Sequence, residues 1–357
     1  MRILVTGNMG YVGPVVVAHL KAALPDADLI GFDAGFFAHN LTGPQFFPEA
    51  MLSEQHFGDT REMAPALLEG VDAVVHLAAV SNDPMGNRYE KVTKDINQDA
   101  SVRLALQAKR AGVKSFVFAS SCSVYGAADG PPRKESDALN PLTAYARSKI
   151  GTERGLRDAD LGAMMVSCLR FATACGMSPR LRLDLVLNDF VACALATKDI
   201  SVLSDGTPWR PLIDVRDMAR AIVWAITRPA EAGGQFLSVN VGADPSNYQV
   251  AELANGVAKA VPGTVVSINT AAPPDKRSYR VDFSLFKALA PDHAPRMTLA
   301  SSIDGLKTGL TEMGFADADF RNSQFMRLKT LERHIEQGRL QADLRWAKPH
   351  PALVQGA

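Results

Sequence analysis

The stretch Thr6-Gly7-Asn8-Met9-Gly10-Tyr11-Val12-Gly13 decides the fold of this chain. It follows Arg2–Thr6, an apolar segment predicted as a buried strand, and it runs into Val12–Leu24, which has helical periodicity. Its glycines allow a tight turn and a close approach of the backbone to a ligand. The helix that follows presents free N–H groups and a positive dipole end, which favour a pyrophosphate. The glycine spacing is G-x-x-G-x-x-G instead of G-x-G-x-x-G, so an ordinary strand–helix turn stays an alternative.

Short apolar segments then alternate with amphipathic ones through the first half of the chain. Strands are predicted at Arg2–Thr6, Leu29–Phe32, Ala73–Leu77, Ser115–Ser120 and Met165–Arg170. Helices are predicted at Val12–Leu24, Met63–Leu68, Asn97–Ala111 and Ala144–Asp158. This alternation indicates an α/β fold with a doubly wound parallel sheet that helices cover on both faces.

The pattern loosens after about residue 175. Helices are predicted at Asp184–Ala196, Val215–Thr227, Val250–Val261, Ser301–Gly309 and Phe320–Gln337, and strands at Ser201–Leu203, Gln235–Asn240 and Val265–Asn269. We therefore expect a dinucleotide-binding domain over 1–175, to which residues of about 210–245 return, and a smaller, mainly substrate-binding α/β part over 176–315. Residues 316–357 would form a C-terminal helix and tail, with 341–357 loosely held.

Composition excludes several classes of protein. The 357 residues carry 38 Lys and Arg against 38 Asp and Glu, so neither a general nucleic-acid binder nor a polybasic membrane-surface protein is expected. No apolar run is long enough to span a bilayer. The four cysteines are not closely paired, which favours a reduced, cytoplasmic setting, and the seven histidines lack metal-ligand spacing, so no metal is expected.

Two carboxylates follow the glycine-rich stretch. Asp33 ends the second predicted strand, 20 residues after Gly13, where it would accept hydrogen bonds from ribose hydroxyls and repel a 2′-phosphate. That preference favours NAD over NADP, although Asp33 could instead cap a loop. Asp59, in Gly58-Asp59-Thr60-Arg61, could bind the adenine amino group or be an ordinary turn residue.

A second set of residues suggests proton transfer. Tyr145 and Lys149 lie four residues apart on a predicted helix and therefore share a face. Ser120-Ser121-Cys122-Ser123-Val124-Tyr125-Gly126 follows a core strand and places hydroxyls at the carboxyl edge of the sheet. A free tyrosine has a pKa of about 10, which a nearby ammonium and a positive nicotinamide would lower. Tyr145 could then take a proton from a sugar hydroxyl that Ser121 also binds, while Lys149 holds the nicotinamide ribose. The alternative is a surface Tyr–Lys pair beside a serine-rich loop.

In this order, the motifs resemble the extended short-chain dehydrogenase/reductase family, the NAD-dependent sugar-nucleotide epimerases and dehydratases typified by UDP-galactose 4-epimerase. The resemblance covers about residues 1–315 and implies a Rossmann-type fold. Further matching motifs are His76-Leu77-Ala78-Ala79, Asn97, Leu169-Arg170-Phe171, Arg210-Pro-Leu-Ile-Asp-Val and Asn240-Val241-Gly242.

The pattern and the resemblance together give the expected site residues. Contacts to NAD are expected from Gly7, Met9, Gly10, Tyr11, Val12, Gly13, Asp33, Asp59, Thr60, Leu77, Ala78, Ala79, Asn97, Ser120, Tyr145, Lys149 and Phe171. Within this set, the resemblance gives Asn97 the task of supporting the active-site loop. The expected catalytic residues are Ser121, Tyr145 and Lys149.

Substrate contacts are expected on several loops of the chain. They are Asn82, Ser121, Thr173, Asn188, Arg180, Arg182, Arg210 and Arg277. Asn188 and Arg210 match the family's diphosphate-binding residues, Thr173 replaces an Asn that is usual there, and Asn82 lies in a polar loop. The other arginines are candidates by charge, and each arginine could instead be a solvated surface residue.

Departures from the family pattern narrow the reaction. Dehydratases carry Asp-Glu where this chain has Cys122 and Ser123, so water elimination is disfavoured. Cys122 and His76 are expected to be packing residues. The predicted function is an NAD-dependent sugar-nucleotide epimerase, acting at C4 through a transient 4-keto intermediate. A 4-keto-sugar-nucleotide reductase and a non-catalytic NAD(H)-sensing protein remain alternatives. The resemblance also implies a homodimer through helices at about 98–111 and 144–158.

Overall fold

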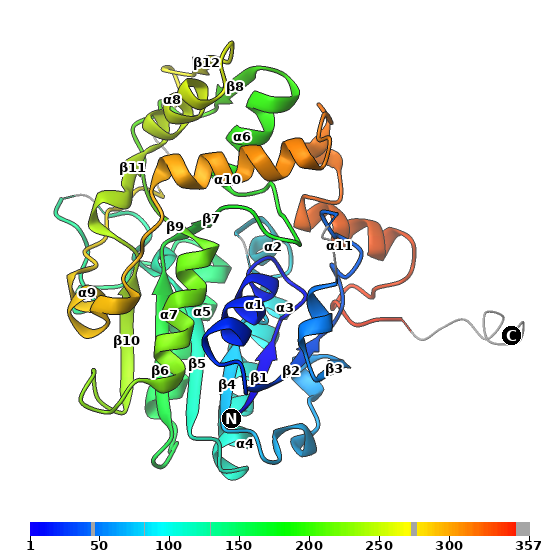
Figure 1. Cartoon of the computed structure of the whole chain (residues 1–357), viewed down its shortest axis with the longest axis vertical. Coiled ribbons are helices and arrows are strands. Elements are labelled where there is room, and N and C mark those ends of the chain that lie inside the picture. Colours follow the sequence, from blue (N-terminus) through cyan, green and yellow to red (C-terminus); the bar gives the residue numbers. More distant parts are fainter. Residues whose placement is uncertain (44–46, 82, 129, 273–276, 348–357) are drawn as a thin grey trace, which may run out of the picture.

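A computed structural model describes residues 1–43, 47–81, 83–128, 130–272 and 277–347. Its centre is a seven-stranded parallel sheet in the order β10-β6-β5-β4-β1-β2-β3 (Figure 1). The strands are β1 Arg2–Thr6, β2 Asp28–Asp33, β3 Glu54–Phe57, β4 Ala73–His76, β5 Ser115–Ser121, β6 Met165–Phe171 and β10 Phe236–Val241. The doubly wound α/β fold predicted from the sequence is confirmed.

Helices cover both faces of this sheet, because successive residues of a strand point to opposite sides. Ile3 and Val5 of β1 pack in the larger core with α1 and α7, whereas Leu4 lies in a second core with α4. The helices are α1 Gly13–Ala23, α4 Ala100–Arg110, α5 Ala144–Asp158 and α7 Val215–Thr227. Strand β4, Ala73–His76, is therefore buried at every position, and its first three residues are all apolar instead of alternating with polar ones.

A smaller α/β part lies above the central sheet in Figure 1. It contains a three-stranded sheet, β11-β9-β7, and a two-stranded sheet, β12-β8. The elements are β7 Thr173–Cys175, α6 Val186–Ala196, β8 Asp199–Val202, β9 Trp209–Asp214, β11 Asn247–Gln249, α8 Val250–Ala260, β12 Val265–Ile268 and α10 Leu299–Glu312. Helix α9, Ser284–Leu289, lies beside β10 of the central sheet (Figure 1). Between β9 and β11 the chain returns to the central sheet, where β10 pairs with β6. The domain limits at 175 and 315 stay a prediction.

The C-terminal segment packs against α2 (Asp83–Arg88), α3 (Glu90–Lys94) and the residues before them. In a third buried cluster, Leu331 of α11 (Arg327–Glu336) and Leu344 join Val80 and Met85. We expected residues 341–357 to be loosely held, and for 341–347 this is wrong. Leu344 is 1% exposed, and the Trp346 indole donates a hydrogen bond to the Ala34 carbonyl at 2.5 Å. Residues 348–357 lie outside the described residues.

Candidate active site

One cavity of about 750 Å³ lies where the carboxyl end of the central sheet meets the smaller α/β part. Its walls come from the loops after β1, β4 and β5 on one side and from residues 182–186 and 201–204 on the other. Open α/β sheets bind ligands at this edge, and the volume is that of a small-molecule site. The cavity is therefore the candidate active site.

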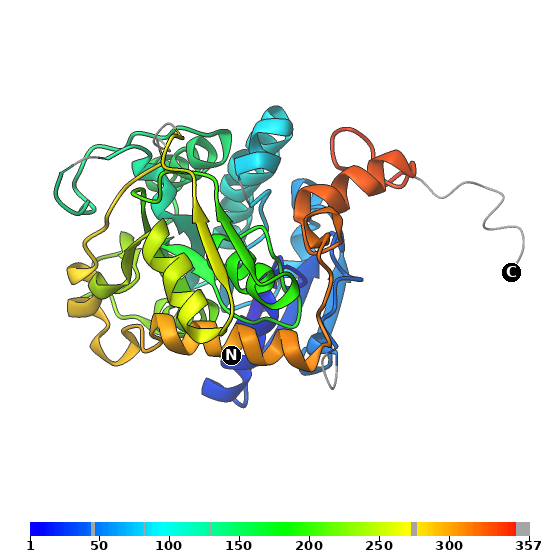
Figure 2. The same cartoon turned by 90° about the horizontal axis from the view of Figure 1, so that it is seen from above.

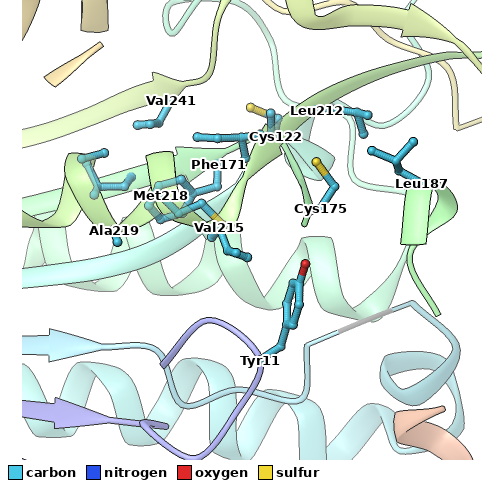
Figure 3. Close-up of a cluster of buried hydrophobic side chains, with 14 of the residues drawn as sticks. Tyr11, Cys122, Phe171, Cys175, Leu187, Leu212, Val215, Met218, Ala219 and Val241 are labelled. Atoms are coloured by element: carbon cyan, nitrogen blue, oxygen red, sulfur yellow. The ribbon is translucent and has the colours of Figure 1, made fainter. Parts of the chain in front are cut away.

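The glycine-rich loop forms the floor of one end. Gly7 has a φ of +74°, and a Cβ there would lie 2.6 Å from the Ala78 main-chain nitrogen, so the position requires glycine. Gly7, Gly10, Tyr11, Val12 and Gly13 line the cavity. The Tyr11 side chain points away from the floor, and its hydroxyl donates a hydrogen bond to the Gly176 carbonyl at 2.6 Å (Figure 3). That bond ties the loop to the smaller part of the molecule.

Met9 is a correction to the expected cofactor contacts. Its side chain is 6% exposed and does not line the cavity. Its main-chain N–H already donates to a carboxylate oxygen of Asp33 at 3.0 Å. Met9 thus supports the shape of the loop instead of contacting a ligand.

Asp33 lines the cavity beside the glycine-rich loop. Its two oxygens accept hydrogen bonds from the N–H groups of Met9 and Gly35, at 3.0 and 2.7 Å, and burial raises the pKa of the carboxyl group. A carboxylate offers about four acceptor positions, so capacity remains for ribose hydroxyls. Asp59 and Thr60 line the same end, but the Asp59 carboxylate also pairs with Arg61 at 2.5 Å.

The end of the cavity at the carboxyl ends of β4, β5 and β6 has an apolar wall. Leu77, Ala78, Ala79 and Phe171 line it, together with Ser120, whose hydroxyl donates to Glu153 at 2.5 Å. Asn97 is buried behind this wall and does not line the cavity. Its amide bonds both main-chain groups of Val80, at 2.8 and 3.0 Å, so it supports the loop and is not itself a cofactor contact.

Ser121, Tyr145 and Lys149 come together at this end. Ser121 ends β5, and α5 begins one residue before Tyr145, where the Thr143 hydroxyl caps the helix by accepting the Ala146 N–H at 3.1 Å. The Lys149 ammonium lies 5.4 Å from the centre of the Tyr145 ring and donates to the Ala119 carbonyl at 2.7 Å. The phenol of Tyr145, the hydroxyl of Ser121 and the amine of Lys149 therefore share one wall of the cavity.

Burial is the largest influence on the pKa values of Tyr145 and Lys149. It raises the pKa of Tyr145 to about 12, although the Ser121 hydrogen bond and the Arg182 charge lower it. Burial also lowers the pKa of Lys149 to about 7, against the opposing effect of Glu153. We predicted that the ammonium would lower the pKa of Tyr145; in the protein alone, burial outweighs any such lowering.

Comparisons with known proteins identify the family. The profile of the "NAD dependent epimerase/dehydratase family" matches residues 3–242. The chain belongs to the NAD-dependent epimerase/dehydratase family. It is an enzyme of the extended short-chain dehydrogenase/reductase type, as its motifs predicted, and its cofactor is NAD.

Two relatives of the epimerase/dehydratase chain are similar over most of their length. An uncharacterized UDP-glucose epimerase, YtcB, of Bacillus subtilis (strain 168) is 30% identical over 260 residues, 68% of this chain and 77% of the relative. A UDP-glucose 4-epimerase of Azospirillum brasilense is 29% identical over 260 residues, covering 66% and 71%.

Solved structures share the fold of this chain. The UDP-glucose-4-epimerase of Stenotrophomonas maltophila has a TM-score of 0.75 at 22% identity, covering 89% of this chain and all of that one. The NDP-hexosamine 5,6-dehydratase TunA also has a TM-score of 0.75, at 23% identity, covering 89% and 99%. At such identities the likeness shows the fold alone.

The site of this epimerase/dehydratase chain fits NAD. A Cβ at Gly7 would fill the space against Ala78, and a Cβ at Gly13 would overlap the Asn8 carbonyl, so the loop presents main chain to a pyrophosphate. Asp33 lies beside that loop, in the place where a ribose would bind. Among the described residues, no group of three or more His, Cys, Asp or Glu could hold a metal ion. None of the helices in the described ranges is long and apolar enough to cross a membrane.

The expected substrate residues divide into two groups. Thr173, Arg182, Arg210 and Arg277 line the cavity, as Ser121 does. Arg182 is 5% exposed and pairs with Asp184 at 2.5 Å, so it is a buried wall residue instead of a solvated charge. Asn82 lies outside the described residues.

Arg180 and Asn188 are corrections, because neither lines the cavity. Arg180 is 1% exposed and pairs with Glu49 at 2.6 Å. Asn188 is fully buried, and its amide bonds the Gly176 N–H, the Tyr11 hydroxyl and the Arg182 carbonyl. Both side chains therefore hold the walls together instead of contacting substrate.

Sequence reasoning missed several residues of the cavity wall. They are Asp83, Tyr279, Arg321, Arg327, Leu331 and Leu344. The first lies next to the predicted contact Asn82, which is a usable signal. The last four lie beyond about residue 315, where the family resemblance ends, and the sequence gives no local motif for them.

His76 gives a prediction about stability. Its ring nitrogens bond the hydroxyls of Thr6 and Ser101, at 2.6 and 2.7 Å, and burial, with the Lys149 charge second, lowers its pKa to about 3. Unfolded histidine takes up a proton near pH 6.5, so between pH 6.5 and 3 the unfolded state binds more protons. The free energy of unfolding is therefore expected to fall as pH falls through that window. Urea titrations at several pH values should show a shallower fall in His76→Gln; His56→Gln, on edge strand β3, is the control, and an unchanged slope in His76→Gln would contradict the assignment.

Proposed function

We propose that this protein is a sugar-nucleotide epimerase that inverts C4 of a nucleotide-linked sugar through a transient 4-keto sugar. The observation that carries the proposal is that Ser121, Tyr145 and Lys149 line the same cavity as the glycine-rich loop, with the Lys149 ammonium 5.4 Å from the centre of the Tyr145 ring. Thr173, Arg210 and Arg277 line the same cavity and are available to bind a second nucleotide.

Tyr145 and Ser121 act together in the proton transfer at C4. Tyr145, as phenolate, accepts the proton of the C4 hydroxyl, and Ser121 donates a hydrogen bond to the same oxygen. Bound NAD would supply the hydride acceptor and donor for C4, and its positive nicotinamide would favour the ionised form of Tyr145. Tyr145 then returns the proton to the C4 oxygen after the sugar has presented its other face. Lys149, fixed by the Ala119 carbonyl, holds the nicotinamide ribose.

Two further features support a nucleotide sugar as the substrate. Arg210 and Arg277 line the cavity, and cations suit a diphosphate. The relatives above are described as UDP-glucose epimerases, which makes a UDP-sugar the first substrate to test. Cys122 bonds the Arg170 carbonyl at 3.0 Å, and burial raises the pKa of its thiol, so this position supplies no acid or base for dehydration.

The test is to incubate the purified protein with UDP-, GDP-, CDP- and dTDP-sugars without added cofactor and to follow C4 epimers by NMR. We expect one epimer pair to interconvert without added cofactor and the protein to contain NAD as purified. Conversion of a 4-keto sugar that requires added NAD(P)H would indicate the reductase instead. Bound NAD without turnover of any sugar would indicate the sensing protein.

The homodimer through α4 and α5 and the cytoplasmic location also belong to this proposal. Light scattering of the purified protein tests the dimer: a mass of one chain would exclude it.

A further inference from the structure

Arg327 carries a buried charge that the structure leaves without an anion. It begins α11, is 2% exposed and lines the active-site cavity. One guanidinium nitrogen, Nη2, donates to the Arg180 carbonyl at 2.7 Å, and the guanidinium lies 4.5 Å from the centre of the Phe37 ring. The other, Nη1, is buried and has no hydrogen-bond partner among the described residues.

Arg327 differs from the neighbouring arginines, because each of those pairs with a carboxylate. Arg180 pairs with Glu49 at 2.6 Å, and Arg182 pairs with Asp184 at 2.5 Å. No carboxylate of the described part of the chain pairs with Arg327. A buried, unpaired cation is costly, and the cost is removed when an anion binds.

The lining of the cavity indicates which anion is missing. Arg327 lines the same cavity as Gly7, Gly10 and Gly13 of the glycine-rich loop, whose backbone is shaped for a pyrophosphate. A planar guanidinium matches that group, because it can offer two parallel N–H donors. We propose that Arg327 binds the pyrophosphate of NAD.

Hydrogen bonds hold the C-terminal segment to the residues that follow β2 and β3, beside the candidate NAD site. His334 of α11 bonds the Phe36 carbonyl at 3.0 Å, and the Asp343 carbonyl accepts a hydrogen bond from Arg61 at 2.9 Å. Figure 2 shows this segment, in orange and red, alongside the blue N-terminal elements. Arg327 lies outside residues 3–242, the part that matches the family profile.

The test compares ligands that differ in the pyrophosphate. Arg327→Met keeps the packing on Phe37 and removes the charge. We measure how well ADP-ribose, which carries the pyrophosphate, and adenosine, which lacks it, displace NADH from the holoenzyme. The affinity for ADP-ribose is expected to fall about 10- to 100-fold, and that for adenosine to stay within about twofold. Arg333→Met, an exposed arginine of the same helix, is the control and should change neither.

Other results would overturn the proposal. Equal losses for both ligands, or no loss for either, would make Arg327 a structural residue. A loss confined to UDP would assign it to the diphosphate of the substrate, and a loss confined to NADP would assign it to a 2′-phosphate. If Arg327→Met does not fold, Arg327→Lys carries the test, with a smaller loss confined to ADP-ribose expected because the fork of donors becomes a point charge. None of these readouts depends on turnover, so they stand apart from the proposed C4 chemistry.

Discussion

Tyr145→Phe is expected to lower the turnover rate about 10³- to 10⁴-fold while leaving NAD bound. The change removes the phenolic oxygen and keeps the ring, which lines the cavity and lies beside Lys149. Packing and the glycine-rich loop are untouched, so loss of proton transfer is isolated from loss of binding. The measurements are epimer interconversion by NMR and the NAD content of the denatured protein.

The control is Tyr248→Phe. Tyr248 lies in β11, is partly buried and does not line the active-site cavity, so removing its hydroxyl should leave turnover within about twofold. Wild-type turnover in Tyr145→Phe would contradict the proposed mechanism and move the proton to another group of the wall. Loss of NAD from that variant would show that Tyr145 binds the cofactor more than it reacts.

The parts of the site that the sequence predicted are built from short, contiguous motifs. The first strand, Arg2–Thr6, and the helix Ala144–Asp158 have the predicted bounds. In both, local periodicity and tertiary burial agree, which is where sequence patterns are reliable. The strand predicted at Ala73–Leu77 is present as β4, Ala73–His76. The position of Ser121 could also be predicted, because a parallel sheet brings the carboxyl ends of its strands to one edge.

Contacts between distant residues could not be predicted in this way. Arg180 has the composition of a phosphate ligand, yet its partner is Glu49, 131 positions earlier. The bounds of strand β3, Glu54–Phe57, could not be predicted because it lies at the sheet edge and shows no apolar alternation. The C-terminal wall depends on pairs such as Arg61 and Asp343, 282 positions apart, and nothing local in either segment announces them.

Gly7→Ala is expected to abolish NAD binding and to lower the free energy of unfolding by about 2–5 kcal/mol. Two costs combine. The residue has a φ of +74°, which a side chain disfavours, and the new Cβ would lie 2.6 Å from the Ala78 nitrogen and 2.8 Å from its Cα. Because both neighbours are backbone atoms, the overlap is relieved only by moving the loop or β4, and the main-chain groups then leave the pyrophosphate position. Urea titration and isothermal titration with NAD measure the two effects.

Gly112→Ala separates these costs. Gly112 follows α4 with a φ of +82°, but a Cβ there meets nothing within 4 Å. Gly112→Ala should therefore lower the free energy of unfolding by only the cost of the positive φ, about 1–2 kcal/mol. The excess destabilisation in Gly7→Ala then measures the close packing of the loop on the residues after β4. If the two variants lose the same stability and Gly7→Ala still binds NAD, the loop accommodates a side chain. The glycine would then be needed only for its backbone conformation, and recognition of NAD at this end would depend on Asp33 and the neighbouring N–H groups.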